Sequence, residues 1–402
     1  MNELSGTSFI NNQNSNNFKL FRKSTDDSSS NKYIKETLKY HRVDDQFEEL
    51  KSQVFPLEKE LFECLNLEWG VDIISEDIPL IDEHYKNYYL HLFRTANPDP
   101  NKENFFLIHG FLSSGLHFIC LVPYLIKRYN IFIPDTIGMG LSSRPQVKFT
   151  SPLQCENYFI NIYHIVIKNL FFKGRFNIKK EYYLCGHSLG GFIASRYLLR
   201  FPIGIKKVFL LSPAGITDYR IPGTVMNRNI GYGMYCATVC CPTLVWPCKI
   251  RAQKMYRNCC CHNCIEKAYG TWIFSFDESE IKKNKDGTKF YLDNEKISLI
   301  LRKLTILSLD YPDDLYKCAF YLFGVPPPAA FLPLEKILFS MNRIQIIFAF
   351  GENDWMDRDG AYRLQQVNPD RYKVFTVKGG GHSFALTNPK EICEIIGQYF
   401  EE

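Results

Sequence analysis

The stretch that decides the fold is EYYLCGHSLGGFIASRYLLRF, residues 181–201. It opens with a short apolar run, passes through the pentapeptide GHSLG at 186–190, and continues as a helical segment. A G-x-S-x-G sequence between a strand and a helix is typical of a sharp turn that exposes a nucleophilic serine. The helix N-terminus behind such a turn favours developing negative charge. An ordinary glycine-rich turn is the alternative, but the strand-turn-helix context favours a nucleophile at Ser188.

A serine hydroxyl is a weak nucleophile and needs an adjacent base. We predict His382 as this base, because it follows three glycines at 379–381 and the strand-like run YKVFTV near the chain end. The base in turn needs a carboxylate that orients it. Asp354, just after the strand-like run IQIIFAF, is the predicted acid, and Asp357 is the alternative. A surface-loop histidine is the alternative for His382, but the three glycines before it indicate a special backbone path and favour the base role.

Working outward, apolar runs alternate with helical stretches on both sides of residues 181–201. The runs at 104–110, 130–135 and 206–213 read as buried strands, and the segment at 113–128 reads as a helix. Continuous apolar strands that alternate with helices predict a parallel sheet covered on both faces. Together with the chain order serine, acid, histidine, this predicts an α/β-hydrolase fold, with a mostly parallel central sheet flanked by helices.

Changes in composition divide the chain. An opening hairpin is predicted at 71–81 and 88–95, and the strand-helix rhythm breaks after Ala214 before resuming with IQIIFAFG. The predicted parts are a disordered low-complexity tail at 1–35, core at 36–215, an inserted Cys-rich lid domain at 216–330, and core at 331–402.

Ester hydrolysis also needs donors for the developing oxyanion. We predict the backbone N–H groups of Leu189, the residue after the nucleophile, and of Phe111, in the loop that follows the run FFLIHG. Other motif residues are expected to support these loops by packing or hydrogen bonding: His109, Gly110, Gly186, His187 and Gly190. No metal or organic cofactor is needed for this chemistry.

The bulk properties restrict partners and compartment. The net charge of +5 is too small to predict nucleic-acid binding, but it is compatible with attraction to anionic lipid surfaces. The first residues carry no basic segment followed by an apolar run, so no secretory signal is expected. We therefore expect a cytoplasmic protein with reduced thiols, peripherally associated with membranes.

Eight of the 14 cysteines fall in a short stretch of the predicted lid: Cys236, Cys240, Cys241, Cys248, Cys259, Cys260, Cys261 and Cys264. A zinc site that uses Cys261, His262 and Cys264 is disfavoured because the dense run at 259–264 lacks a clean pair of C-x-x-C knuckles, and disulfides are disfavoured without export. The uncharged stretch 229–248 is flanked by basic residues. This favours a lid that docks on membrane and is acylated at Cys259, Cys260 and Cys261. A buried apolar lid with incidental thiols is the alternative.

Several motifs together resemble one group of α/β-hydrolases. These are HGF at 109–111, DTIGMGLSSRP at 135–145, GHSLGG at 186–191, SPAG at 212–215 and GENDWMD at 351–357. The group includes the N-acyl-phosphatidylethanolamine lipases, the comparative-gene-identification lipase coactivators and the yeast cardiolipin deacylase. The resemblance covers the chain from about residue 70 to its end.

The resemblance implies hydrolysis of lipid acyl esters in phospholipids, lysophospholipids or acylglycerols. Members that lack the serine act as lipase coactivators, so a non-catalytic lipid-surface protein that regulates a lipase partner is one alternative. A soluble esterase for small esters is another. Some members carry an H-x-x-x-x-D motif linked to acyltransferase activity. Here His382 is followed at that spacing by Thr387, which disfavours that activity.

Overall fold

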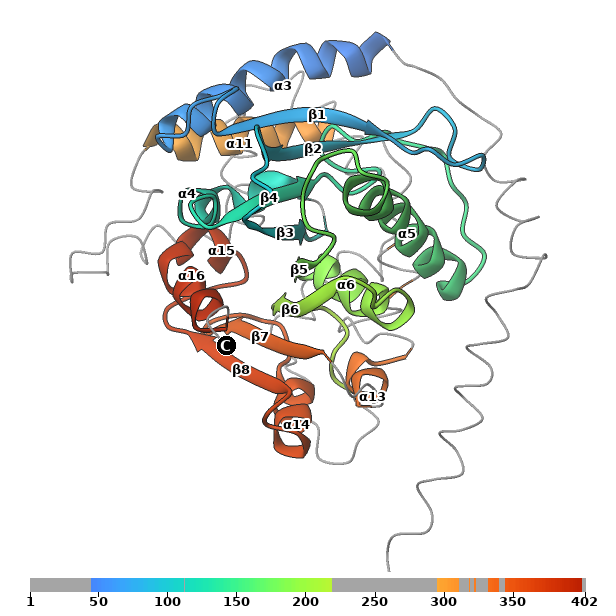
Figure 1. Ribbon diagram of the computed structural model, residues 1–402, viewed down its shortest axis with the longest axis vertical. Helices are drawn as coiled ribbons and strands as arrows, with labels where there is room; N and C mark the ends of the chain where they lie inside the picture. The colour runs from blue at the N-terminus through green and yellow to red at the C-terminus, as the bar shows by residue number, and fades with distance from the viewer. Residues whose placement is uncertain are drawn as a thin grey trace, which may run out of the picture.

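The computed structural model describes residues 45–111, 113–218, 295–310, 318, 322, 332–339 and 344–399. Within this part of the chain a single eight-stranded sheet runs through the molecule, with helices on both faces (Figure 1). The predicted tail at 1–35 and the cysteine cluster at 236–264 lie outside the described residues.

The sheet has the order β1-β2-β4-β3-β5-β6-β7-β8. Only β2 runs against its neighbours, because it pairs antiparallel with both β1 and β4 while every later pair is parallel. The strands are β1 (Ile73–Pro79), β2 (Tyr89–Thr95), β3 (Glu103–Ile108), β4 (Tyr129–Pro134), β5 (Tyr182–His187), β6 (Ile205–Leu211), β7 (Gln345–Gly351) and β8 (Tyr372–Val377). The predicted hairpin and mostly parallel sheet are confirmed.

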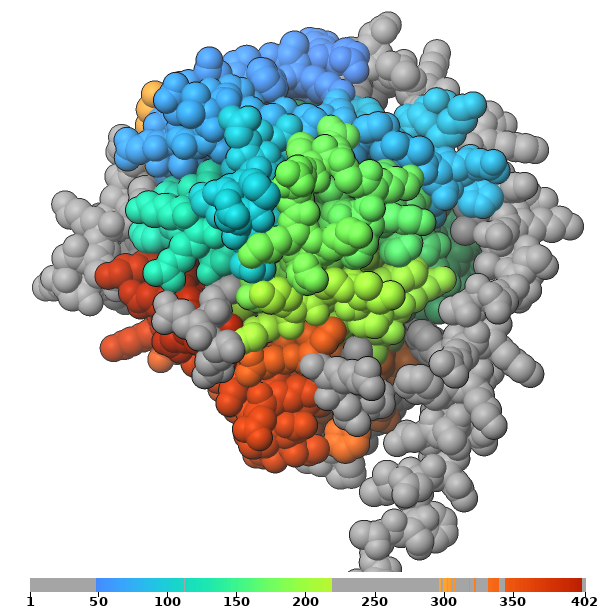
Figure 2. Space-filling model, in the orientation of Figure 1, coloured from blue at the N-terminus to red at the C-terminus, as the bar shows by residue number. Residues whose placement is uncertain are grey.

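The helices cover the two faces of the sheet. One face carries α5 (Pro152–Ile167), which ends in the π-helical turn η2 (Lys168–Phe172), with α6 (Leu189–Arg200), α13 (Leu334–Leu338) and α14 (Asp359–Val367). The other carries α3 (Asp45–Cys64), the 3₁₀ helix η1 (Gly115–Leu121), α4 (Val122–Leu125), α11 (Glu295–Asp310), α15 (Phe384–Thr387) and α16 (Pro389–Gln398). Figure 2 shows the hairpin side in blue at one end of the molecule and the β7–β8 side in orange and red at the other.

The alternation of side chains along each strand builds a core on both faces. In β3, Phe106 and Ile108 pack into the cluster beneath α5 and α6, whereas Phe105 and Leu107 pack into the opposite cluster. All four are fully buried. A strand buried on both faces reads as an unbroken apolar run, which is why the sequence of this strand predicts its central position.

The structure differs from the prediction at 113–128. In place of one regular helix, η1 is followed directly by the single turn α4. Pro123 stands at the start of that turn and has no N–H to donate to the carbonyl of Ile119. The Val122 N–H donates to this carbonyl instead, in the tighter 3₁₀ pattern.

Part of the predicted insertion lies at the hairpin end of the sheet. Helix α11, within 216–330, lies beside α3 (Figure 1), and the ammonium of Lys296 lies 2.9 Å from a carboxylate oxygen of Glu60. At the other end of the insertion, the N–H groups of Leu334 and Glu335 donate to the carbonyls of Gly215 and Ile216. The predicted domain boundaries stay predictions. In the described part of the chain, no helix combines the length and apolar character needed to cross a bilayer.

Candidate active site

Ser188 sits in a strained turn between β5 and α6. Its φ of 53° lies in the region that a non-glycine residue rarely adopts, and α6 begins at the next residue. Two glycines make the turn possible. A Cβ on Gly186 would lie 2.3 Å from the carbonyl oxygen of Gly190, and one on Gly190 would lie 2.1 Å from that of Ile108. The G-x-S-x-G pattern is therefore a steric requirement of this turn.

His382 connects Ser188 to a buried carboxylate. Its Nε2 lies 3.1 Å from Ser188 Oγ, and its Nδ1 lies 3.0 and 3.1 Å from the two carboxylate oxygens of Asp354. The serine comes from the turn after β5, the acid from the loop after β7 and the histidine from the loop after β8. The structure thus brings together Ser188, Asp354 and His382 at the carboxyl ends of three parallel strands.

Asp354 is almost completely enclosed, and its oxygens are well provided with donors. Besides His382, Ser212 Oγ donates to Oδ2, and the Met356 N–H donates to Oδ1 over 2.9 Å. Burial acts to raise the pKa of Asp354, but the His382 ring and these hydrogen bonds outweigh it and lower the pKa. The carboxylate is therefore ionised at neutral pH beside Nδ1 of the histidine.

Asp357, the alternative acid, is occupied elsewhere. Its Oδ1 accepts hydrogen bonds from Thr217 Oγ1 at 3.1 Å and from the Asp359 N–H at 2.8 Å, at the start of α14. Thr217 Oγ1 also accepts from the Gly360 N–H. Asp357 thereby ties the loop after β7 to the chain beyond β6, and the carboxylate that contacts His382 is that of Asp354.

The loop predicted to supply an oxyanion donor passes directly beside the nucleophile. A Cβ on Gly110 would lie 3.1 Å from the Cβ of Ser188 and 2.9 Å from His187 Nδ1, so a side chain here would force its neighbours to shift. Phe111 follows, partly buried against the core, and Leu189 is the first residue of α6. Leu189 follows Ser188 in the chain and Phe111 follows Gly110, while the role of both as oxyanion donors stays a prediction.

His109 fixes the path of this loop. Its Nε2 accepts the Thr136 N–H at 2.7 Å, so its proton resides on Nδ1, which donates to the Gly110 carbonyl at 2.8 Å. Burial lowers the pKa of His109, and the ring is fully enclosed. A neutral ring bonded at both nitrogens holds the loop and has no capacity left to act as a base.

Asp135 stabilises the end of the same loop by hydrogen bonds to its backbone. Its carboxylate accepts the Gly115 N–H at 2.6 Å and the Leu141 N–H at 2.7 Å. Gly140 has φ of +55°, and a Cβ there would overlap the Asp135 carboxylate at 1.9 Å. The DTIGMGLSSRP stretch is thus a compact turn that joins the segment after Phe111 to the end of β4.

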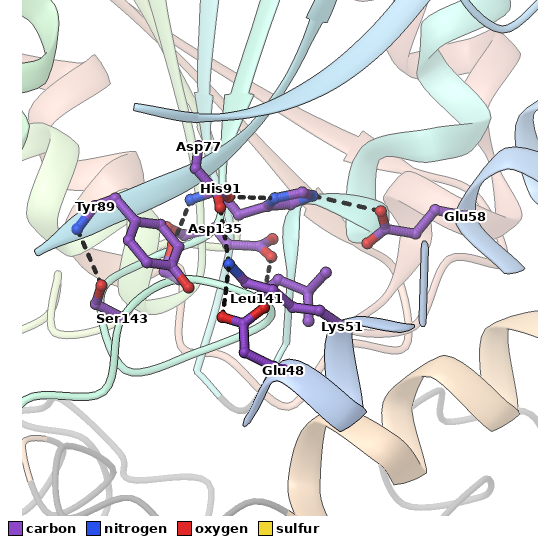
Figure 3. A network of polar contacts seen from close by, with 10 residues as sticks. Glu48, Lys51, Glu58, Asp77, Tyr89, His91, Asp135, Leu141 and Ser143 are labelled. Atoms are coloured by element: carbon purple, nitrogen blue, oxygen red, sulfur yellow. Dashed lines mark hydrogen bonds and ion pairs between the residues drawn. The ribbon is translucent and has the colours of Figure 1, made fainter. Parts of the chain in front are cut away.

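An ion-pair network centred on the buried side chains of His91 and Glu58 lies next to Asp135 (Figure 3). His91 of β2 lies with Nδ1 3.0 Å from Asp77 of β1 and with Nε2 3.4 Å from Glu58 of α3. Burial acts against a charged ring, but Glu58, Asp77 and Asp135 outweigh it and raise the pKa of His91 to about 10. Lys51 of α3 also pairs with Asp77, at 2.8 Å. A buried imidazolium therefore joins the N-terminal helix to the hairpin.

Replacing His91 with leucine should lower the free energy of unfolding by about 3–5 kcal/mol, because Glu58 would be left buried without its partner. His91 is 4% exposed and Glu58 is 1% exposed, so solvent cannot compensate the carboxylate. Urea unfolding followed by circular dichroism measures this change. The matched control is Lys51→Gln, which removes a partly exposed pair and should cost at most about 1 kcal/mol. Equal losses in the two variants would contradict the assignment of a buried imidazolium.

Two residues of the site were not predicted. Ser212, which donates to Asp354, occurs in the SPAG stretch, whose resemblance to the family is the signal that could have indicated it. In the structure its φ is 43°, a value that a residue other than glycine rarely adopts. His117 lies in η1, and its ring stacks on His187 with centroids 4.0 Å apart. His117 carries no motif, and its position depends on how η1 packs in three dimensions.

Comparison with known proteins places the chain in a family. Residues 103–234 match the model of the alpha/beta hydrolase fold. The chain is 30% identical over 306 residues to the 1-acylglycerol-3-phosphate O-acyltransferase ABHD5 of Sus scrofa, covering 74% of this chain and 79% of that protein. It is 28% identical over 315 residues to the (lyso)-N-acylphosphatidylethanolamine lipase of Homo sapiens, covering 75% and 82%.

Similarity also extends to plant proteins and to solved structures. The chain is 23% identical to a 1-acylglycerol-3-phosphate O-acyltransferase of Arabidopsis thaliana, covering 70% of this chain. It is 22% identical to a probable 1-acylglycerol-3-phosphate O-acyltransferase of Oryza sativa, and it spans 66% of the length of this rice relative and 63% of that of the Arabidopsis relative. The carboxylesterase CesB of Bacillus subtilis shares the fold with a TM-score of 0.55 at 15% identity, covering 87% of this chain and 98% of that one.

Fold, nucleophile turn and relatives agree on one class of protein, the α/β-hydrolases. The chain belongs to the α/β-hydrolase family, in the branch that holds the lipase and acyltransferases named above.

Proposed function

We propose that this protein is a serine hydrolase that cleaves carboxylic esters of lipids through Ser188, His382 and Asp354. The observation that carries the proposal is the placement of His382 within 3.1 Å of Ser188 Oγ and 3.0 Å of the Asp354 carboxylate. This is the geometry in which an imidazole can take the serine proton while a carboxylate holds its tautomer.

The reaction would proceed in two halves. Ser188 Oγ attacks the ester carbonyl, His382 takes its proton, and the negative charge on the carbonyl oxygen is met by the N–H groups of Leu189 and Phe111. His382 then gives the proton to the leaving alcohol, and an acyl-serine remains. Water, deprotonated by His382, hydrolyses the acyl-serine and restores Ser188.

The substrate class is inferred from the relatives. The human relative is named as a lipase of N-acylated phosphatidylethanolamine and its lyso form, and this chain matches most of its length. Phospholipids, lysophospholipids and acylglycerols share the ester that the two-step mechanism requires. A small-ester esterase is the alternative within the same chemistry.

The test is labelling with a fluorophosphonate probe followed by tryptic digestion. Cleavage after Lys180 and Arg196 gives a peptide that contains both Ser188 and Ser195, and fragmentation should place the adduct on Ser188. Protein unfolded in urea serves as the control, since the reactivity depends on the folded site. Turnover is then compared on acylglycerols, lysophospholipids, phospholipids and a short p-nitrophenyl ester. Folded protein that takes up no probe would overturn the proposal in favour of a non-catalytic regulator of another lipase.

Acyl transfer is a second candidate, favoured by the names of the pig and Arabidopsis relatives. In that reaction the hydroxyl of 1-acylglycerol-3-phosphate would replace water in attacking the acyl-serine. Thr387 stands where the H-x-x-x-x-D motif has an acid, which disfavours it. Adding 1-acylglycerol-3-phosphate to the turnover assay decides between them, because transfer yields a diacyl product and hydrolysis yields free fatty acid.

Peripheral membrane association belongs to the same proposal and rests on sequence, since 229–248 and the clustered cysteines at 236–264 lie outside the described residues. The uncharged stretch with basic flanks suits an interface with anionic headgroups. Replacing Cys259, Cys260 and Cys261 together by serine should move the protein from the membrane fraction to the supernatant. Sedimentation of cell lysates measures this, and an unchanged membrane fraction would contradict acylation at these positions.

A further inference from the structure

His187, directly before the nucleophile, reaches across to the loop that carries the base. Its Nε2 lies 2.8 Å from the main-chain carbonyl oxygen of His382. The two imidazole rings are also in contact, with centroids 4.7 Å apart and planes inclined by 47°. His187 is only 3% exposed, so water does not compete for this hydrogen bond.

The carbonyl oxygen decides the tautomer of His187. A carbonyl only accepts, so Nε2 must carry the proton and Nδ1 is the bare nitrogen of a neutral ring. A Cβ on Gly110 would come within 2.9 Å of this Nδ1, which therefore faces the backbone of the oxyanion loop. Among the described residues, Nδ1 has no hydrogen-bond partner. The ring thus makes one polar contact, and that contact is with residue 382.

The surroundings keep this donor uncharged. Burial, together with His117, His382 and His109, lowers the pKa of His187 well below its usual value. Burial likewise lowers the pKa of His117 to about 3, and its ring stacks on His187 at an interplanar angle of 23°. A cationic donor here would oppose the positive charge that His382 takes up during the reaction. A neutral imidazole supplies the N–H without that repulsion.

We propose that His187 is a positioning residue. Its Nε2–H donates a hydrogen bond to the main-chain carbonyl of His382 and thereby keeps the His382 ring within hydrogen-bond distance of Ser188. The inference rests on the proposed function. It also gives a reason for a histidine at the second position of GHSLG, where the motif itself accepts any residue. Loss of this N–H donor should make the position of the His382 ring less well defined, without changing how the substrate binds.

A matched pair of variants separates the donor from the ring. His187→Phe keeps an aromatic ring against His117 but has no N–H, whereas His187→Gln can place an amide N–H at the same reach. With p-nitrophenyl butyrate as substrate, we expect His187→Phe to lower kcat about tenfold, the usual net value of one hydrogen bond. KM should stay within about twofold, and His187→Gln should keep kcat within about threefold of the wild type.

Thermal unfolding accompanies the kinetics, since a variant that is only poorly folded would lose active sites. The concentration of working sites comes from fluorophosphonate titration, and kcat is expressed per titrated site. If kcat per site is the same in His187→Phe and in the wild type, or falls equally in both variants, the inference is overturned. If the wild type itself neither labels nor turns over, the proposed function fails first, which is a different and recognisable result.

A spectroscopic readout checks the hydrogen bond without any turnover. Two-bond nitrogen–proton correlation spectra of histidine-labelled protein distinguish the two neutral tautomers and the imidazolium. We expect the His187 ring, assigned by its absence from the His187→Gln spectrum, to be the neutral Nε2–H form at pH 7 and to remain so at pH 5. An Nδ1–H tautomer or a charged ring would overturn the proposed contact with residue 382.

Discussion

Ser188→Ala abolishes ester hydrolysis: we expect kcat to fall by roughly 10⁶-fold, as it does when a serine hydrolase loses its nucleophile. The reason is that alanine removes the atom that forms the acyl-enzyme, while the oxyanion donors and the pocket remain. The fall is measured with p-nitrophenyl butyrate and with the best lipid substrate, and fluorophosphonate labelling should vanish in parallel.

Ser195→Ala is the matched control for this variant. Ser195 lies in α6, which begins directly after Ser188; it is fully buried and donates to the Gly191 carbonyl at 2.8 Å. Its loss should cost about 1 kcal/mol of stability and leave kcat unchanged. Comparable loss of activity in the two variants would mean that Ser188 acts through the fold and not as the nucleophile.

Asp354→Asn should lower kcat by about 10⁴-fold, the effect of an asparagine that stabilises the wrong histidine tautomer. An asparagine can present its amide N–H groups to His382 Nδ1, which then becomes an acceptor and leaves a proton on the nitrogen that faces Ser188. The carboxylate that favours the imidazolium is lost as well. We expect this loss at Asp354 because its carboxylate oxygens lie 3.0 and 3.1 Å from Nδ1 of His382.

Asp357→Asn provides the comparison, because it makes the same replacement, a carboxylate by an amide, at the other candidate acid. Asp357 accepts from Thr217 Oγ1 and from the Asp359 N–H, and an asparagine oxygen can accept both hydrogen bonds. We expect kcat within about threefold of the wild type and a small change in stability. The two kcat values, measured side by side, decide the acid. A larger loss in Asp357→Asn would reverse the assignment.

The sequence could predict those parts of the site that depend on local sterics. The turn at Ser188 needs glycine two residues to either side, and these glycines are visible in the pentapeptide. The strands beside it are buried on both faces and read as apolar runs, so the sheet and the serine, acid, histidine order were predictable. The choice between Asp354 and Asp357 was not, because it depends on how the loop after β7 turns into α14.

Contacts between distant segments could not be predicted either. Glu58 and His91 are 33 positions apart in the sequence, and each looks like an ordinary surface residue until α3 packs on the hairpin. The helices α3, α5, α11 and α14 were not predicted, because their sequences contain none of the catalytic or glycine-turn motifs from which the other elements were identified. His117 joins the site only because η1 packs against α15 and places the His117 ring on that of His187, and a local sequence pattern does not record such a contact.

The hydrogen bonds between the hairpin and the turn at Asp135 bear on how much of the chain a stable fragment needs. The family match starts at residue 103, after the hairpin. Yet the His91 carbonyl accepts the Asp135 N–H at 2.7 Å, and its N–H donates to Ser142 Oγ at 2.9 Å. A chain trimmed to the matched boundary would lose both bonds to the turn that braces Gly115. A fragment that keeps these hydrogen bonds has to include β2, and it needs α3 for the Glu58 carboxylate that pairs with His91.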